Sequence, residues 1–132
     1  MEFHVSSKWV DSRLSVSRCK NAEITLDTAL DGNQDAFNPA ELLLSALSAC
    51  IIKGIMRVSP TLDFELTGIE VVIDGVRQDV PPKMESINYE IIVDTDESDD
   101  RLELLHKNVK KYGTVFNTVS AGTQLSGNLR RK

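Results

Sequence analysis

The sequence has few of the residues that build metal, nucleotide or disulfide-stabilised sites. It contains two cysteines and two histidines among 132 residues. These residues form no CxxC pair, no HExxH motif and no histidine pair at ligand spacing, and no glycine-rich phosphate loop is present. We therefore expect no metal and no cofactor, and we expect the two thiols to be reduced rather than paired in a disulfide framework.

Basic residues are also in the minority. Fifteen Lys and Arg face twenty Asp and Glu, which leaves a net charge of −5 and a pI near 5.0. An acidic balance disfavours nucleic acid or an anionic membrane as the main partner. No positively charged start followed by an apolar core occurs within Met1–Lys20. We expect a cytoplasmic protein.

The composition predicts one folded domain over residues 1–132. Hydrophobic residues make up 41% and charged residues 27% of the chain, values typical of a globular protein. The order of the expected elements, given below, predicts the α+β class.

The stretch from Asn38 to Val58, NPAELLLSALSACIIKGIMRV, predicts a central helix. Asn38 suits the N-cap, Pro39 the first helical position, and Glu41 the capping-box position. Apolar residues occur on nearly every face, so we expect burial from several sides. Polar interruptions such as Lys53 argue against a membrane span, and Pro60 is expected to end the helix at Ser59.

The remaining pattern predicts strands around this helix and a second helix near the C-terminus. Leu66–Arg77 and Ser86–Asp94 are expected to form an antiparallel pair, with Ile87, Tyr89, Ile91 and Val93 on the buried face. The acidic stretch Thr95–Asp100 is expected to lead into an amphipathic helix with Gly113 as its left-handed cap. The apolar positions of this helix are Leu102, Leu105, Val109 and Tyr112. The other expected segments are short strands at Phe3–Val5, Trp9–Val10, Leu14–Val16 and Ala22–Leu26, turns at Ser6–Ser7, Asp11–Ser12 and Asp79–Pro82, a loop over Asp27–Phe37, a possible helical turn at Val115–Ser120 and a last strand at Thr123–Arg131.

Cys50, past the middle of the central helix, is the main candidate for chemistry. A reactive thiol needs nearby cations and some solvent access. A small, buried core residue is the alternative, because free cysteine is among the most buried residue types. The residues alone leave both interpretations open.

Other polar residues have simpler explanations. Cys19 stands between Arg18 and Lys20, and its pairing with Cys50 requires Cα atoms within ~7 Å. Glu41 is explained by capping. Arg13 and Arg18 in the N-terminal strands could stabilise a thiolate, although solvated arginines are the default, and we assign no role to the solitary His4 and His106.

The helix NPAELLLSALSAC resembles the hallmark of the OsmC/Ohr family, and YGTVFNTV, from Tyr112 to Val119, is similar to the family's second motif. The resemblance implies an OsmC-like α+β fold with antiparallel sheets around a buried central helix, in an intertwined homodimer with sites between subunits. It also implies reduction of organic hydroperoxides, with Cys50 as the attacking cysteine and Arg13, or next Arg18, as the thiolate-stabilising arginine.

Two positions depart from the family pattern. The second cysteine should fall at Gly113, and the glutamate of Asn-Pro-Glu at Ala40. One hypothesis is therefore a one-cysteine thiol peroxidase whose Cys50 is resolved by an external thiol. Another is a non-catalytic OsmC-fold dimer that binds a small apolar or thiol-bearing ligand at the subunit interface. A third is a purely structural role for Cys50.

Overall fold

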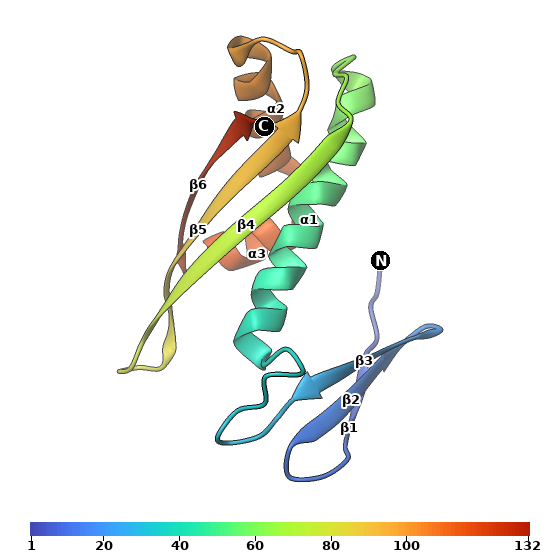
Figure 1. The fold of residues 1–132 in the computed structure, drawn as a ribbon, viewed down its shortest axis with the longest axis vertical. Coiled ribbons are helices and arrows are strands. Elements are labelled where there is room, and N and C mark those ends of the chain that lie inside the picture. The colour runs from blue at the N-terminus through green and yellow to red at the C-terminus, as the bar shows by residue number, and fades with distance from the viewer. The chain divides into compact units, whose positions relative to one another are not determined.

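The computed structural model describes residues 1–132 and separates into two compact units, Met1–Leu43 and Leu44–Lys132. Each unit contains one three-stranded sheet, and helix α1 (Pro39–Thr61) begins in the first unit and continues in the second (Figure 1). The mixture of two sheets and three helices confirms the α+β class.

The first unit is an antiparallel meander of β1 (Ser6–Trp9), β2 (Leu14–Cys19) and β3 (Ala22–Asp27), in the order β1-β2-β3. The predicted strand at Phe3–Val5 and turn at Ser6–Ser7 are wrong, because both serines lie in β1. Pairing with β2 determines this strand: Ser7 lies opposite Ser17, and their hydroxyl oxygens are 2.7 Å apart. Serine is a weak strand signal by itself, so the local sequence could not show it.

This first unit has no apolar core of its own. Its only buried residues are Ser17 and Asp27. The strand predicted at Ala22–Leu26 is confirmed within β3, but four of those five residues are exposed, so their alternation of apolar and polar residues does not mark a buried face in this chain. Its large apolar side chains are exposed at Phe3, Val5, Trp9, Val10, Ile24, Leu30 and Phe37.

The second unit has a sheet in the order β4-β5-β6, formed by β4 (Gly68–Gln78), β5 (Lys83–Asp94) and β6 (Gln124–Arg131). The predicted antiparallel pair is confirmed as β4 and β5. β6 instead runs parallel to β5, so the expectation of wholly antiparallel sheets is wrong at this pair. Two helices between these strands, α2 (Asp99–Tyr112) and α3 (Thr114–Ser120), carry the chain back to the other end of the sheet, as a parallel pairing requires.

The core of the second unit lies on one face of β5. Ile87, Tyr89, Ile91 and Val93 are each at most 2% exposed, which confirms the predicted alternation. They belong to the same apolar cluster as Leu47, Ile51 and Ile55 of α1 and Leu105 of α2.

Helix α1 differs from the prediction in its end and in its burial. It continues through Pro60 to Thr61. A proline so near the end removes only one backbone hydrogen bond, and the Phe64 amide caps the turn by donating to the Ser59 carbonyl at 2.8 Å. Within one chain α1 is buried on one face only, at Leu47, Ile51, Ile55 and Val58.

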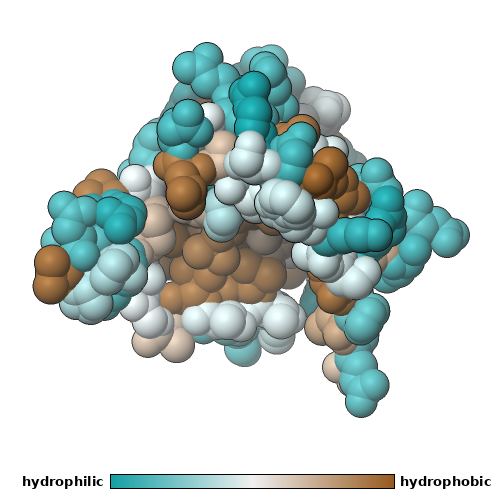
Figure 2. All heavy atoms as spheres, turned by 90° about the horizontal axis from the view of Figure 1, so that it is seen from below, coloured by the Kyte–Doolittle hydropathy of each residue, from teal (hydrophilic) through white to brown (hydrophobic).

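The opposite side of α1 carries an exposed stripe of small and apolar residues, defined here as Ser45, Ala49, Ile52 and Met56. By length and composition α1 could cross a membrane, but core helices of soluble proteins pass the same test. Figure 2 shows one face of the molecule, on which apolar side chains are grouped together.

Gly113 joins α2 to α3 with φ −79° and ψ 118°, so it is not the predicted left-handed cap. Ser98 caps the other end of α2 by accepting a hydrogen bond from the Arg101 amide. The helical turn expected after Val115 is confirmed as α3.

Candidate functional site

Cys50 is a free, half-buried thiol on the edge of the buried face of α1. It packs against the apolar cluster of the second unit. A side chain in this position is shielded on one side by the core and has limited access to solvent on the other.

Gly113 lies close to this thiol. A Cβ atom at position 113 would stand 3.1 Å from Cys50 Sγ and 2.9 Å from Phe116 Cβ. The backbone angles of Gly113 suit any residue, so close packing, and not conformation, is what a side chain here would disturb. The place that the resemblance gives to a second cysteine is therefore beside Cys50.

A second glycine, Gly54 on α1, faces α2. Gly54 lies one turn after Cys50, and a Cβ there would be 3.4 Å from Val109 Cγ1 of α2. A side chain as small as that of alanine at position 54 would therefore be in ordinary van der Waals contact with α2.

Glu41 is confirmed as a capping residue. Its carboxylate accepts a hydrogen bond from the Asn38 amide at 3.1 Å, and its own amide donates to Asn38 Oδ1 at 2.8 Å. These reciprocal bonds hold the side chain at the start of α1. Ala40, where the resemblance expects a carboxylate, can supply none.

The two candidate arginines both lie in the first unit, whereas Cys50 lies in the second. Arg13 is exposed and lies in the bend before β2, not within a strand as expected; its amide donates to Asp11 Oδ1 at 2.8 Å. Arg18 is in β2 and pairs with Glu23 of β3 at 2.7 Å. Arg13 is thus the one of the two without a carboxylate partner for its side chain.

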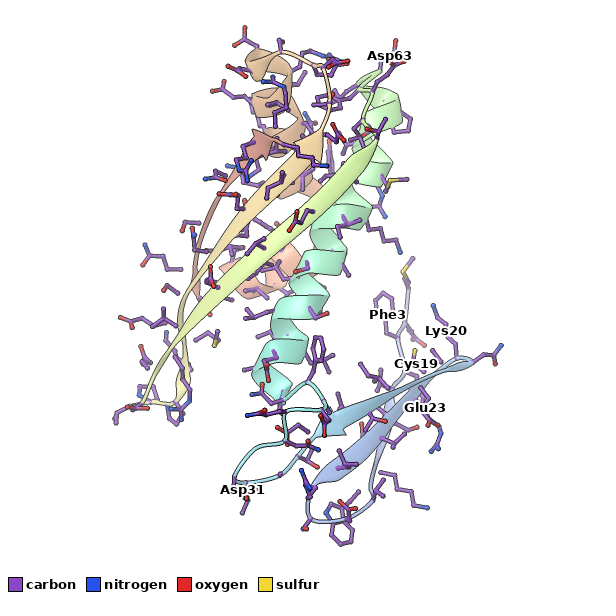
Figure 3. The ribbon with its side chains drawn as sticks, in the orientation of Figure 1. Phe3, Cys19, Lys20, Glu23, Asp31 and Asp63 are labelled. Atoms are coloured by element: carbon purple, nitrogen blue, oxygen red, sulfur yellow. The ribbon has the colours of Figure 1, made fainter.

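Cys19 ends β2 at the hairpin that also carries Lys20 and Glu23 (Figure 3). Both cysteines are free, so the chain has no disulfide between Cys19 and Cys50. No group of three or more His, Cys, Asp or Glu side chains is arranged to hold a metal ion.

His106 has a partner that the sequence did not reveal. Its Nε2 lies 2.7 Å from the hydroxyl oxygen of Tyr89, with the two rings at 89°. Burial lowers the pKa of His106 to about 4, with a smaller contribution from Lys110, and burial raises the pKa of Tyr89 to about 12. The pair is therefore neutral around pH 7, and it links α2 to β5. Tyr89 and His106 are 17 residues apart, and no local pattern joins them.

Comparison with known proteins agrees with this architecture. A family model described as "OsmC-like protein" matches residues 32–126. No curated protein matches the chain.

Several solved structures share the fold at low sequence identity. An OsmC-like protein from Mycoplasma pneumoniae superimposes with a TM-score of 0.91 at 17% identity, over 99% of this chain and 97% of that one. An organic hydroperoxide resistance protein OsmC from Legionella pneumophila gives 0.71 at 16% identity, over 98% and 97%. The organic hydroperoxide resistance protein OhrB of Bacillus subtilis gives 0.68 at 14%, over 98% of both chains. Because the family model covers well over half of its residues, the chain belongs to the OsmC-like protein family.

Proposed function

We propose that this protein is a one-cysteine thiol peroxidase that reduces organic hydroperoxides at Cys50. The observation that carries the proposal is the contact between Cys50 and Gly113. The thiol lies beside the position where the family resemblance expects a second cysteine, and a glycine occupies that position. A disulfide within the chain cannot form there, so an external thiol must complete the cycle.

The chemistry has three balanced steps. The Cys50 thiolate attacks the outer peroxide oxygen; the O–O bond breaks, the alkoxide leaves and takes a proton as the alcohol, and Cys50 becomes a sulfenic acid. An external thiol then attacks the Cys50 sulfur, which forms a mixed disulfide and releases water. A second external thiol attacks this disulfide, returns Cys50 to the thiol and leaves as the oxidised disulfide.

We further propose that the protein works as a homodimer, with α1 from each copy at the interface. The exposed stripe on α1 supports this, because Ile52 and Met56 are 36% and 62% exposed on the side of α1 that this chain leaves uncovered. Its small members, Ser45 and Ala49, would let a second helix approach closely. Contiguous exposed apolar surface of this kind marks an interaction site.

The exposed apolar residues of the first unit also support a homodimer. The first unit, Met1–Leu43, buries only Ser17 and Asp27 and so has too little apolar burial to be stable alone. Its exposed Phe3, Trp9 and Phe37 would gain roughly 25 cal/mol per Å² when covered. A second copy can cover them, as the intertwined dimer implied by the resemblance would. Arg13, in this unit, stays the proposed thiolate-stabilising arginine.

The two departures from the family pattern favour a second function, the binding of a ligand without catalysis. Ala40 supplies no carboxylate, and Gly113 supplies no second thiol. A dimer that binds a small apolar or thiol-bearing ligand without turnover would need neither group.

A coupled assay separates the two functions. Purified protein is mixed with cumene hydroperoxide and excess dithiothreitol, and peroxide loss is compared between wild type, Cys50→Ser and Cys19→Ser. We expect saturable loss with wild type and Cys19→Ser and none above background with Cys50→Ser. Mass spectrometry without reductant should show one added oxygen on the Cys50 peptide. A Cys50 thiol that stays unmodified in excess hydroperoxide would rule out the peroxidase and leave the binding function.

A further inference from the structure

A cavity of about 790 Å³ lies between the C-terminal end of α1, the segment that leads into β4, and the loop from β5 to α2. All of its lining residues belong to the second unit, in which the end of α1 and the start of α2 lie at the same end (Figure 1). Neither Cys50 nor Gly113 is among them, so the cavity is separate from the candidate thiol site. Its volume falls within the range of roughly 300–1,000 Å³ that is typical of small-molecule sites.

The cavity is lined by four carboxylate residues and by no Lys, Arg or His. One of the four, Glu97, is paired with Arg101 of α2, whose Nε lies 3.0 Å from Glu97 Oε2. The other three, Glu65, Asp94 and Asp96, are exposed and take part in none of the five ion pairs of the chain. The cavity therefore carries negative charge that the chain itself does not neutralise.

Apolar side chains also line the cavity, among them Met56, Phe64 and Leu66. Phe64 is only 5% exposed, and the guanidinium carbon of Arg101 lies 5.8 Å from the centroid of its ring. Since Arg101 also pairs with Glu97, this part of the molecule already holds one cation with an aromatic ring and a carboxylate.

Hydrogen bonds join the two segments that carry the unpaired carboxylates. Thr95, which is buried, donates from Oγ1 to the Glu65 carbonyl at 2.5 Å. The Thr67 amide donates to the Asp94 carbonyl at 2.9 Å. Because these bonds hold the walls of the cavity in place before any ligand enters, little ordering of the chain is needed on binding.

We propose that this cavity binds a small organic cation that carries an apolar chain or ring. The three unpaired carboxylates favour a positive charge and disfavour an anion, and the apolar lining contacts the rest of the ligand. An exposed carboxylate attracts a cation only weakly by itself, so both kinds of contact are needed. A metal ion is not the expected ligand, because no three acidic, His or Cys side chains are arranged to hold one.

Three probes with the same six-carbon chain test the role of charge. Hexylamine is protonated at neutral pH, 1-hexanol is neutral, and hexanoate is negatively charged. Each is titrated into the full chain, and amide signals are followed by two-dimensional ¹H–¹⁵N NMR. The variant Glu65→Gln/Asp96→Asn removes two charges from the cavity. The control Asp74→Asn removes an exposed carboxylate of β4 that also has no ion-pair partner and lies outside the cavity.

We expect hexylamine to shift the amide signals of Thr67, Thr95 and Asp96 and to bind at least about tenfold more tightly than 1-hexanol, with about threefold from each exposed carboxylate. Hexanoate should not bind. The double variant should weaken hexylamine binding by about tenfold and leave 1-hexanol binding unchanged, whereas Asp74→Asn should alter neither. In wild type, about 1 M NaCl should remove most of the advantage of hexylamine, because the Debye length falls to about 3 Å.

Equal affinity for hexylamine and 1-hexanol, or equal weakening in Asp74→Asn and the double variant, would overturn the inference. Two other occupants are tested in the same experiment. Met56 also belongs to the exposed stripe on α1, so a shift of the same amide signals with protein concentration, together with loss of hexylamine binding, would show that a second copy covers the cavity. Tighter binding of acetyl-Leu-Lys-Leu-amide, a peptide with the same single charge, would assign the cavity to a protein partner. None of these results depends on the reactivity of Cys50, so the inference and the proposed peroxidase can fail separately.

Discussion

Replacing Gly113 by cysteine should create a disulfide with Cys50. In a disulfide, an S–S bond of about 2.05 Å places each Cβ roughly 3 Å from the opposite sulfur. A Cβ built at position 113 already lies 3.1 Å from Cys50 Sγ. The backbone of Gly113, with φ −79° and ψ 118°, accepts a cysteine without strain.

The stabilisation can be worked out from the length of chain that the bond closes. Residues 50 to 113 enclose a loop of about 63 residues, for which the chain-entropy relation gives about 4 kcal/mol. The same Cβ would be 2.9 Å from Phe116 Cβ, so α3 must shift by a few tenths of an ångström. Such overpacking costs about 1–2 kcal/mol. We expect a net gain of about 2–3 kcal/mol in the free energy of unfolding.

Urea unfolding of Gly113→Cys with and without dithiothreitol measures this gain within one variant. Gly113→Ser reports the steric cost alone, and Gly113→Cys combined with Cys50→Ser removes the bond but keeps the new thiol. Peptide mapping of the oxidised variant should link Cys50 to the introduced cysteine. Three free thiols after mild oxidation, or no difference between oxidised and reduced midpoints, would refute the placement of Cys50 beside Gly113.

Three further predictions concern stability. A Cβ at Gly127 would overlap the ring of Tyr89, so Gly127→Ala should lower the free energy of unfolding by about 2–3 kcal/mol in urea, whereas Gly122→Ala, with nothing within 4 Å of its Cβ, should change it little. The pKa of His106 is lowered from 6.5, its ordinary value, to about 4 in the folded protein. Between these pH values the unfolded chain binds more protons than the folded protein, so the free energy of unfolding falls as the pH is lowered from about 6.5 to about 4. Allowing for partial solvent access, this loss is about 2 kcal/mol, and His106→Gln should flatten the wild-type pH profile by that amount; an identical slope in both proteins would contradict it. Asn38→Ala removes the cap of α1 and should cost about 1 kcal/mol, read from the urea midpoint, and a midpoint equal to that of wild type would show that the cap contributes nothing.

The features that could be predicted from sequence are those whose contacts lie close along the chain. The capping box joins Asn38 and Glu41, which are three positions apart, and the buried face of β5 follows a simple alternation. Each is decided by backbone geometry over a few residues, so the printed sequence contains all the information needed.

The candidate site was predicted only in part. Cys50 was predicted as the candidate reactive thiol, and the family resemblance predicted that a second cysteine would fall at the position of Gly113. The contact between them depends on how α1 packs against the α2–α3 junction, whose residues lie far from α1 along the chain. The hydrogen bond between Tyr89 and His106 has the same origin, since an isolated histidine in a helix has no sequence feature that names its partner.

The sequence by itself determined where most helices and strands form, because hydrophobic periodicity, caps and turn residues act locally. β1 is the exception, since its serines form a strand only through their pairing with β2. The tertiary structure alone decided that β6 runs parallel to β5, that α1 buries one face and leaves a stripe exposed, and that Gly113 meets the Cys50 thiol. These outcomes depend on which surfaces meet when distant segments pack, and a pattern read along one segment contains no information about the surface that will cover it.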